Sequence, residues 1–206
     1  MRTVDFVRQT LPPVPARVLE VGCGQTGELA SALVAAGYDV LGIDPMAPQG
    51  EHFRRLRLHD LDEPAGSFDA VVAILSLHHV RDLDAGVDRI AELLRPGGVA
   101  VVEEFGWDTI DEPTIAWLAE QRGAAVEGLR EEWLADHLGL HGEAALLTAL
   151  RDRLEERSLE RVPTLFRELG AEVRPLEAAL IEAGTIRALG VRWVGIRAAL
   201  DPDGSG

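Results

Sequence analysis

Apolar runs of strand length alternate with amphipathic stretches through the first half of the chain. Strands are predicted at 17–21, 39–43, 54–58, 68–75 and 99–102, of which the third is short and is not an apolar run. The run at 68–75 is nearly all apolar, which indicates a strand buried on both faces. Between the runs, 28–36 and 83–94 carry apolar residues at helical spacing. Strands that alternate with helices predict right-handed crossovers, and hence a parallel sheet with helices on both faces.

The alternation of strands and helices ends after the fifth predicted strand, at 99–102. Residues 108–170 are rich in Glu, Leu, Arg and Ala, and we expect two to four helices and no strand there. The clearest of these helices is predicted at 144–157, where leucines recur along one stripe. A further helix is predicted at 176–183 and a final strand at 191–197, followed by a frayed tail at 201–206.

Composition and charge exclude several function classes. The 206 residues include 35 Asp and Glu but only 20 basic residues, all of them Arg, for a formal charge of −15. Without Lys, the chain has neither a Schiff-base lysine nor the lysine of a P-loop. The acidity disfavours nucleic acid as a partner, because phosphate binding requires clustered cations. Cys23 is the only cysteine, which favours an intracellular, cytoplasmic protein. No apolar run approaches the roughly 18 residues of a membrane span, so no membrane partner is expected.

A glycine-rich loop suggests where a ligand binds. Gly22-Cys23-Gly24-Gln25-Thr26-Gly27 joins the first predicted strand to a helix, and Asp44 follows the second strand. Glycines let a ligand approach the backbone closely, and the amides of a helix N-terminus favour an anionic group. An acidic side chain one strand away can accept hydrogen bonds from ribose hydroxyls. The pattern predicts a nucleoside cofactor, either NAD or S-adenosylmethionine.

Three features favour S-adenosylmethionine. Glu20 lies within the first strand, where its carboxylate could hold a cationic amino group that NAD lacks. Asp60 and Leu61 follow the third strand, in a position to meet an adenine amino group. The stretch LLRPGGV precedes the fifth strand.

Together these segments, roughly residues 14–106, resemble the class I S-adenosylmethionine-dependent methyltransferases. VLEVGCGQTGELASALVAAGYDVLGIDP is similar to the first motif and the acidic second motif, FDAVVAILSLHHV to the fourth, and LLRPGGVAVVEEF to the fifth. EAGTIRALGVRWVGIRAAL resembles the last strands of small bacterial members. The resemblance implies an α/β fold with a Rossmann-like, doubly wound, mostly parallel sheet of the seven-stranded methyltransferase type, and a helical insertion before the last strands. The family loop is commonly G-x-G-x-G, and Gln25 adds a residue, so Gly27 is left out of the predicted contacts.

The resemblance also implies roles for single residues. Glu20 would contact the amino acid end of the cofactor, Asp44 the ribose and Asp60 the adenine amine. The backbone after the fourth strand would touch the methionyl moiety. The predicted cofactor residues are Glu20, Gly22, Cys23, Gly24, Asp44, Pro45, Asp60, Leu61, Ser76 and Leu77.

Methyl transfer requires the acceptor in line with the S–CH3 bond, and a general base only where the acceptor must lose a proton. His79, just beyond the fourth strand, and His141, in the helical segment, are the predicted catalytic residues, since imidazole titrates near neutrality. His137 and His141 would have metal-binding spacing on a helix. Gly139 and Gly142 argue for a break there, and we expect no metal site.

The chain is expected to form one methyltransferase domain over 1–206. Residues 1–106 would form the cofactor-binding core, 107–170 a helical lid insertion, and 171–200 the C-terminal helix and final strands. The tryptophans of the insertion suggest a small, partly hydrophobic acceptor, methylated by in-line displacement at the sulfonium methyl by a monomer or homodimer. Two alternatives remain open: a Rossmann-type NAD(P)-dependent oxidoreductase, and a non-catalytic S-adenosylmethionine-binding protein.

Overall fold

The computed structural model describes residues 1–199, so the predicted tail at 201–206 lies outside the described residues. One seven-stranded sheet has the order β3-β2-β1-β4-β5-β7-β6. The first five strands run parallel, whereas β7 lies antiparallel between β5 and β6. The predicted Rossmann-like, doubly wound, mostly parallel sheet is confirmed. The strands are β1 (Arg17–Val21), β2 (Asp39–Ile43), β3 (Phe53–Arg54), β4 (Phe68–Ile74), β5 (Leu94–Phe105), β6 (Glu155–Val162) and β7 (Gly190–Ile196).

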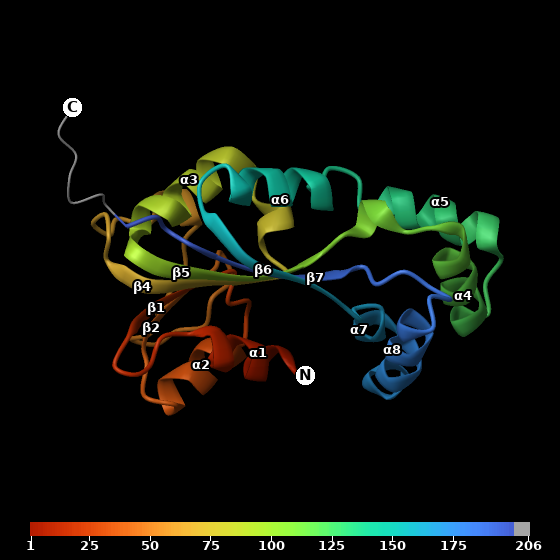
Figure 1. The fold of residues 1–206 in the computed structure, drawn as a ribbon, viewed down its shortest axis with the longest axis horizontal. Helices are drawn as coiled ribbons and strands as arrows, with labels where there is room; N and C mark the ends of the chain where they lie inside the picture. The colour runs from red at the N-terminus through yellow and green to blue at the C-terminus, as the bar shows by residue number, and fades with distance from the viewer. Residues whose placement is uncertain (200–206) are drawn as a thin grey trace.

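Side-chain alternation along the central strands builds two cores, one on each face of the sheet. In β4, Ala70 and Val72 pack with the helices α1 and α2, whereas Val71 and Ala73 pack with α3 and α6. Figure 1 shows these helix pairs covering opposite faces. The helices are α1 (Thr3–Thr10), α2 (Glu28–Ala35), α3 (Leu83–Leu93), α4 (Glu112–Arg122), α5 (Val126–Asp136), α6 (Glu143–Arg151), α7 (Phe166–Leu169) and α8 (Arg174–Glu182). None of the helices within residues 1–199 has the length and apolar composition needed to cross a membrane.

A third apolar cluster lies beyond the carboxyl end of β5. It joins α4, α5 and the segment before β7, with Ile115, Leu118, Leu129, Trp133 and Leu189 at its centre. Figure 1 shows α4 and α5 next to α7 and α8 at this end of the sheet. The helices predicted after the fifth strand therefore exist, and they pack around a core of their own.

The prediction of a strand-free segment at 108–170 is wrong, because β6 lies within it. The helix predicted at 144–157 ends at Arg151. Residues 155–162 are rich in Glu, Arg and Leu, which favour helix in isolation. Pairing with β7 decides the outcome instead, helped by the indole of Trp193, whose Nε1 donates to Glu156 at 2.7 Å. The last two strands of the sheet are thus separated in sequence by α7 and α8.

The buried ion pair between Glu103 and Arg192 provides a test of the fold. Arg192 Nε donates to Glu103 Oε2 at 2.7 Å across the β5–β7 pair, and both side chains are buried. Replacing Glu103 by Gln leaves a buried guanidinium without a counter-charge, and we expect a loss of about 3 kcal/mol in the free energy of unfolding. Urea denaturation measures this loss. As the control, Glu155→Gln removes one partner of the exposed pair with Arg157 and should cost less than about 1 kcal/mol. Equal losses in both variants would contradict the assignment.

Candidate functional site

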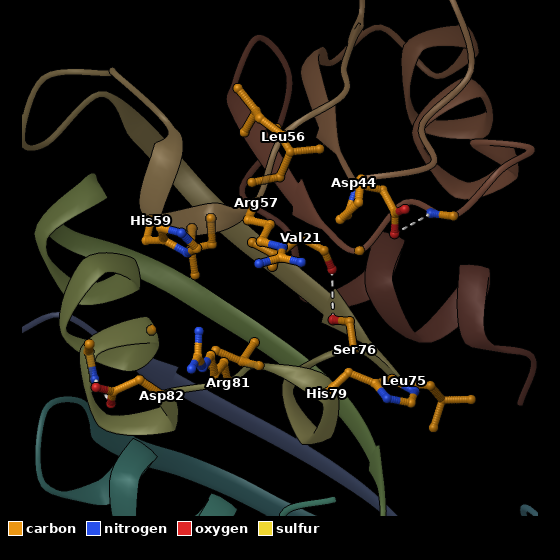
Figure 2. A pocket seen from close by; sticks show the side chains of 18 residues that line it. Val21, Asp44, Leu56, Arg57, His59, Leu75, Ser76, His79, Arg81 and Asp82 are labelled. Carbon is orange, nitrogen blue, oxygen red and sulfur yellow. Dashed lines mark hydrogen bonds between the residues drawn. The ribbon is translucent and has the colours of Figure 1, made fainter.

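A cavity of about 890 Å³ opens at the carboxyl ends of β1, β2 and β4 (Figure 2). Its walls come from the glycine loop after β1, the end of β2, the segment after β3 and the segment from β4 into α3. The chain reverses its direction of travel across the sheet between β1 and β4, because β2 and β3 lie to one side and β5 to the other. Open α/β sheets bind ligands at such a switch point.

The glycine loop lies along one wall of the cavity. Gly22 has a φ of +80°, and a side chain there would collide with Cβ of Ser76, whose Oγ donates to the Val21 carbonyl at 2.7 Å. Gly24, with a φ of +65°, faces open space, and its N–H donates to Asp44 Oδ2 at 3.2 Å. Gly27 differs, because a side chain there would strike the Phe53 ring. The first two glycines line the cavity, and the third allows packing beneath it.

Glu20 lies beneath this loop and does not reach the cavity wall. The residue is 3% exposed, and its Oε2 has no hydrogen-bond partner within residues 1–199. Burial raises the pKa of the Glu20 carboxyl to about 7, with a smaller contribution from the charge of Asp44, while a hydrogen bond from the Ala30 backbone opposes the shift. A buried, unpartnered carboxylate oxygen is rare in folded proteins because its desolvation is not offset. The site therefore holds an acceptor that lacks a donor.

Cys23 also lies within the protein rather than on the cavity wall. Its side chain is buried against Gly42. Burial raises the pKa of the thiol to about 12, and the nearby charges of Glu20 and Asp44 act in the same direction. The sulfur therefore stays protonated near neutral pH, which excludes a thiolate nucleophile at this position.

Asp44 is fixed at the cavity by two backbone amides. Its Oδ2 accepts from Gly24 N–H, and its Oδ1 accepts from Met46 N–H at 2.7 Å. Each carboxylate oxygen can accept a second hydrogen bond. Pro45 follows and lines the cavity as well. The sequence-based placement of these two residues at the site is thus consistent with the geometry.

Asp60 and Leu61 do not line the cavity, contrary to expectation. The strand predicted at 54–58 ends at Arg54, and Leu58–Asp60 form a short 3-10 helix. The Asp60 carboxylate is exposed and lies 3.3 Å from Nε2 of His59, while Leu61 is buried in the core. Arg57 and His59 line the cavity instead. The sequence did not single them out, because an early strand end changes which residues face the site.

The turn after β4 brings the backbone to the cavity. Leu75 has a φ of +51°, the only left-handed residue other than glycine within 1–199, and it lines the cavity beside Ser76. Such conformations persist where the surroundings enforce them, often at functional sites. Here Glu104 does so: its Oε1 accepts from the amides of Ser76 and Leu77 at 2.9 and 2.6 Å, and its Oε2 lies 2.6 Å from His78 Nδ1. The Leu77 side chain itself is buried in the core.

The two predicted catalytic histidines are separated. His79 lines the cavity, as Figure 2 shows, and its pKa is lowered by burial and by the adjacent His78 ring, with Glu104 opposing the shift. His141 does not line this cavity, and its Nε2 lies 2.7 Å from the Val80 carbonyl, so that nitrogen carries the proton. It borders a second groove between α3 and α6. Within residues 1–199, no three metal-ligating side chains are grouped together.

Solved structures share this fold. An S-adenosylmethionine-dependent methyltransferase from Mesorhizobium loti aligns with a TM-score of 0.61 at 21% identity, covering 93% of this chain and 95% of that chain. A SAM-dependent methyltransferase from Methanosarcina mazei aligns with a TM-score of 0.64 at 17% identity, covering 97% of this chain and 99% of that chain. At these identities the likeness establishes the fold, including the seven-stranded methyltransferase-type sheet.

Sequence comparisons identify relatives and a family of this chain. The ubiquinone biosynthesis O-methyltransferase of Xanthomonas axonopodis pv. citri is 38% identical over 112 residues, covering 46% of this chain and 45% of that protein. The chain thus spans less than half the length of the curated relatives it matches. The family model described as a methyltransferase domain matches residues 2–162. Because that match extends over most of the chain, this protein belongs to the methyltransferase-domain family.

Proposed function

We propose that this protein transfers a methyl group from S-adenosylmethionine to a small, partly hydrophobic acceptor. The observation that carries the proposal is the buried, unpartnered Oε2 of Glu20 beneath the glycine loop. A cationic donor is the partner that relieves such an oxygen, and the cofactor carries an ammonium group at its amino acid end. The family and the O-methyltransferase relatives support the same reaction.

The residues present fit that cofactor. Glu20 is buried next to the lining residues Val21 and Gly22, and it would hold the ammonium group if the cofactor reaches behind the glycine loop. The free lone pairs of Asp44 would accept from the ribose hydroxyls. Gly24 leaves the loop backbone open to the methionyl part, and Gly22 lets the turn at Ser76 lie close against the loop. When bound, the cofactor supplies a methyl group activated by its sulfonium.

The residues of the chain would orient the acceptor toward the methyl group and remove its proton. Holding two reactants in line supplies much of the rate in such displacements. A hydroxyl acceptor must also lose its proton, and a ring nitrogen of His79 takes it, since the lowered pKa leaves the imidazole neutral at neutral pH. The geometry gives no such role to His141, which lies at the neighbouring groove.

The proposed lid consists of the helices between β5 and β6, although none of their residues lines the cavity. Helices α4 and α5 pack beyond β5 as a unit with its own apolar core, which suits a lid. Trp117 and Trp133 are buried in this core, whereas Trp107 is half-buried, with its Nε1 donating to the His141 carbonyl at 3.3 Å. Trp107 does not line the cavity, but among the tryptophans of this segment it has the most surface left for a hydrophobic acceptor.

Glu20→Gln tests the assignment of the ammonium site. Loss of a charged hydrogen bond should weaken binding of S-adenosylhomocysteine by about 10- to 100-fold. Since the carboxyl pKa is about 7, the carboxylate fraction in the wild type rises between about pH 6 and pH 8, and affinity should rise with it. Calorimetric titration measures both effects, and the variant should show a flat profile over this range. NADH binding in place of S-adenosylhomocysteine would overturn the cofactor assignment.

Asp44→Ala tests the ribose contact, with a matched control. Removing the carboxylate should weaken binding of S-adenosylhomocysteine by about 1–3 kcal/mol. Asp60→Ala removes a carboxylate that is exposed and outside the cavity, and affinity should stay unchanged. A loss in Asp60→Ala equal to that in Asp44→Ala would restore the adenine contact implied by the family pattern.

His79→Gln tests the general base. With phenols as acceptors, kcat should fall by about 10²- to 10⁴-fold, while binding of S-adenosylhomocysteine stays the same. His141→Gln should leave kcat within a few-fold of the wild type, because its ring lies outside the cavity. Formation of S-adenosylhomocysteine measures the rate. A large loss in His141→Gln with none in His79→Gln would reverse the assignment.

A further inference from the structure

Two arginines project into the cavity from different segments. Arg57 precedes the 3-10 helix at Leu58–Asp60, and Arg81 lies between the turn after β4 and the start of α3. Figure 2 shows Arg57 in the middle of the view beside Val21, and Arg81 at the lower left beside Asp82. The two segments therefore each bring one guanidinium group to the cavity.

Both arginines are exposed, and neither guanidinium group has a partner among residues 1–199. Arginines elsewhere commonly pair with carboxylates or backbone carbonyls, as Arg17, Arg95 and Arg192 do. Within residues 1–199, the arginines without a side-chain hydrogen bond or ion pair are Arg8, Arg57, Arg81 and Arg187. Asp82 is next to Arg81 in sequence, but it accepts from Ala85 N–H at 3.0 Å and caps α3.

The charge of the cofactor does not account for this pair. S-adenosylmethionine carries a sulfonium, an ammonium and one carboxylate, which leaves it net positive. Asp44 and Asp82 also line the cavity, but neither pairs with a guanidinium group, and each guanidinium group would repel a cation placed next to it. The guanidinium groups become favourable if an anion shares the cavity, because the planar guanidinium matches a carboxylate or phosphate in bidentate geometry.

The cavity has room for a second ligand. Its volume of about 890 Å³ lies near the upper end of the roughly 300–1,000 Å³ that ligand sites span. We infer that the methyl acceptor carries a carboxylate or phosphate group, which binds between Arg57 and Arg81. This inference rests on the proposed methyl transfer. It adds an anionic group to the partly hydrophobic acceptor described above.

Matched probes test the inference by binding alone. The protein is saturated with S-adenosylhomocysteine and titrated by calorimetry with phenol, 4-hydroxybenzoate and phenyl phosphate. At least one of the two anionic probes should bind about tenfold more tightly than phenol, and added salt should reduce the difference. Arg57→Gln and Arg81→Gln should each weaken binding of that anionic probe by about 5- to 20-fold, with phenol and S-adenosylhomocysteine unaffected. Arg187→Gln, which removes an exposed unpaired guanidinium outside the cavity, should bind all probes as the wild type does.

The experiment distinguishes a failure of the anion site from a failure of the proposed methyl transfer. Equal binding of phenol and both anions, or no binding of either anion, would overturn the anionic acceptor. So would a loss of S-adenosylhomocysteine affinity in Arg57→Gln and Arg81→Gln with unchanged anion binding, because the arginines would then serve the cofactor. If the wild type fails to bind S-adenosylhomocysteine at all, the proposed methyl transfer fails, whereas anion binding that depends on both arginines would still establish the anion site.

Discussion

The carboxylate of Glu104 holds the turn after β4, which forms one wall of the cavity. It stands at the end of β5 and accepts both amide hydrogens of the turn that leaves β4, while its second oxygen meets the His78 ring. This anchor acts together with two further hydrogen bonds, from Leu75 N–H to the Glu103 carbonyl at 2.7 Å and from Ser76 Oγ to the Val21 carbonyl at 2.7 Å, to hold the left-handed Leu75 and to keep Ser76 against Gly22. The cavity wall is therefore positioned from within the sheet by a buried charge that does not itself line the cavity.

Glu103, the residue before Glu104, anchors several elements on the opposite face of the sheet. Glu103 accepts from Thr3 at 2.8 Å and from Arg192, and it also pairs with Arg167. One carboxylate thus connects α1, β7 and α7 to the middle of the sheet. Consecutive residues in a strand point to opposite faces, so two adjacent glutamates anchor both layers at the edge where the parallel strands end.

The sequence predicts those strands and site residues whose position is determined by neighbouring residues in the chain. It does not predict those whose position is determined by pairing with distant strands. The bounds of β1 and β2 follow from runs that are apolar on both faces, and the prediction of both strands is confirmed. The β6 strand depends on pairing with a strand that follows it in the chain, so its charged residues gave no local signal. Asp44 could be placed because it directly follows a buried strand. Asp60 could not, because only backbone pairing determines that β3 stops at Arg54.

The raised pKa of Glu20 bears on the kind of ligand that the proposed site would bind. Burial of this acid, whose Oε2 has no donor among residues 1–199, disfavours the ionised form and raises the pKa. A cationic group placed at Oε2 favours the carboxylate, so binding such a ligand and releasing the proton become one coupled event. Burial, together with the charges of Glu20 and Asp44, raises the pKa of the Cys23 thiol and keeps it neutral, which prevents a further anion from competing for that cation. In the proposed site, selectivity for a cationic group would come from the Glu20 oxygen that has no donor among residues 1–199, because carboxylates already engaged in pairs and caps have less to offer a ligand.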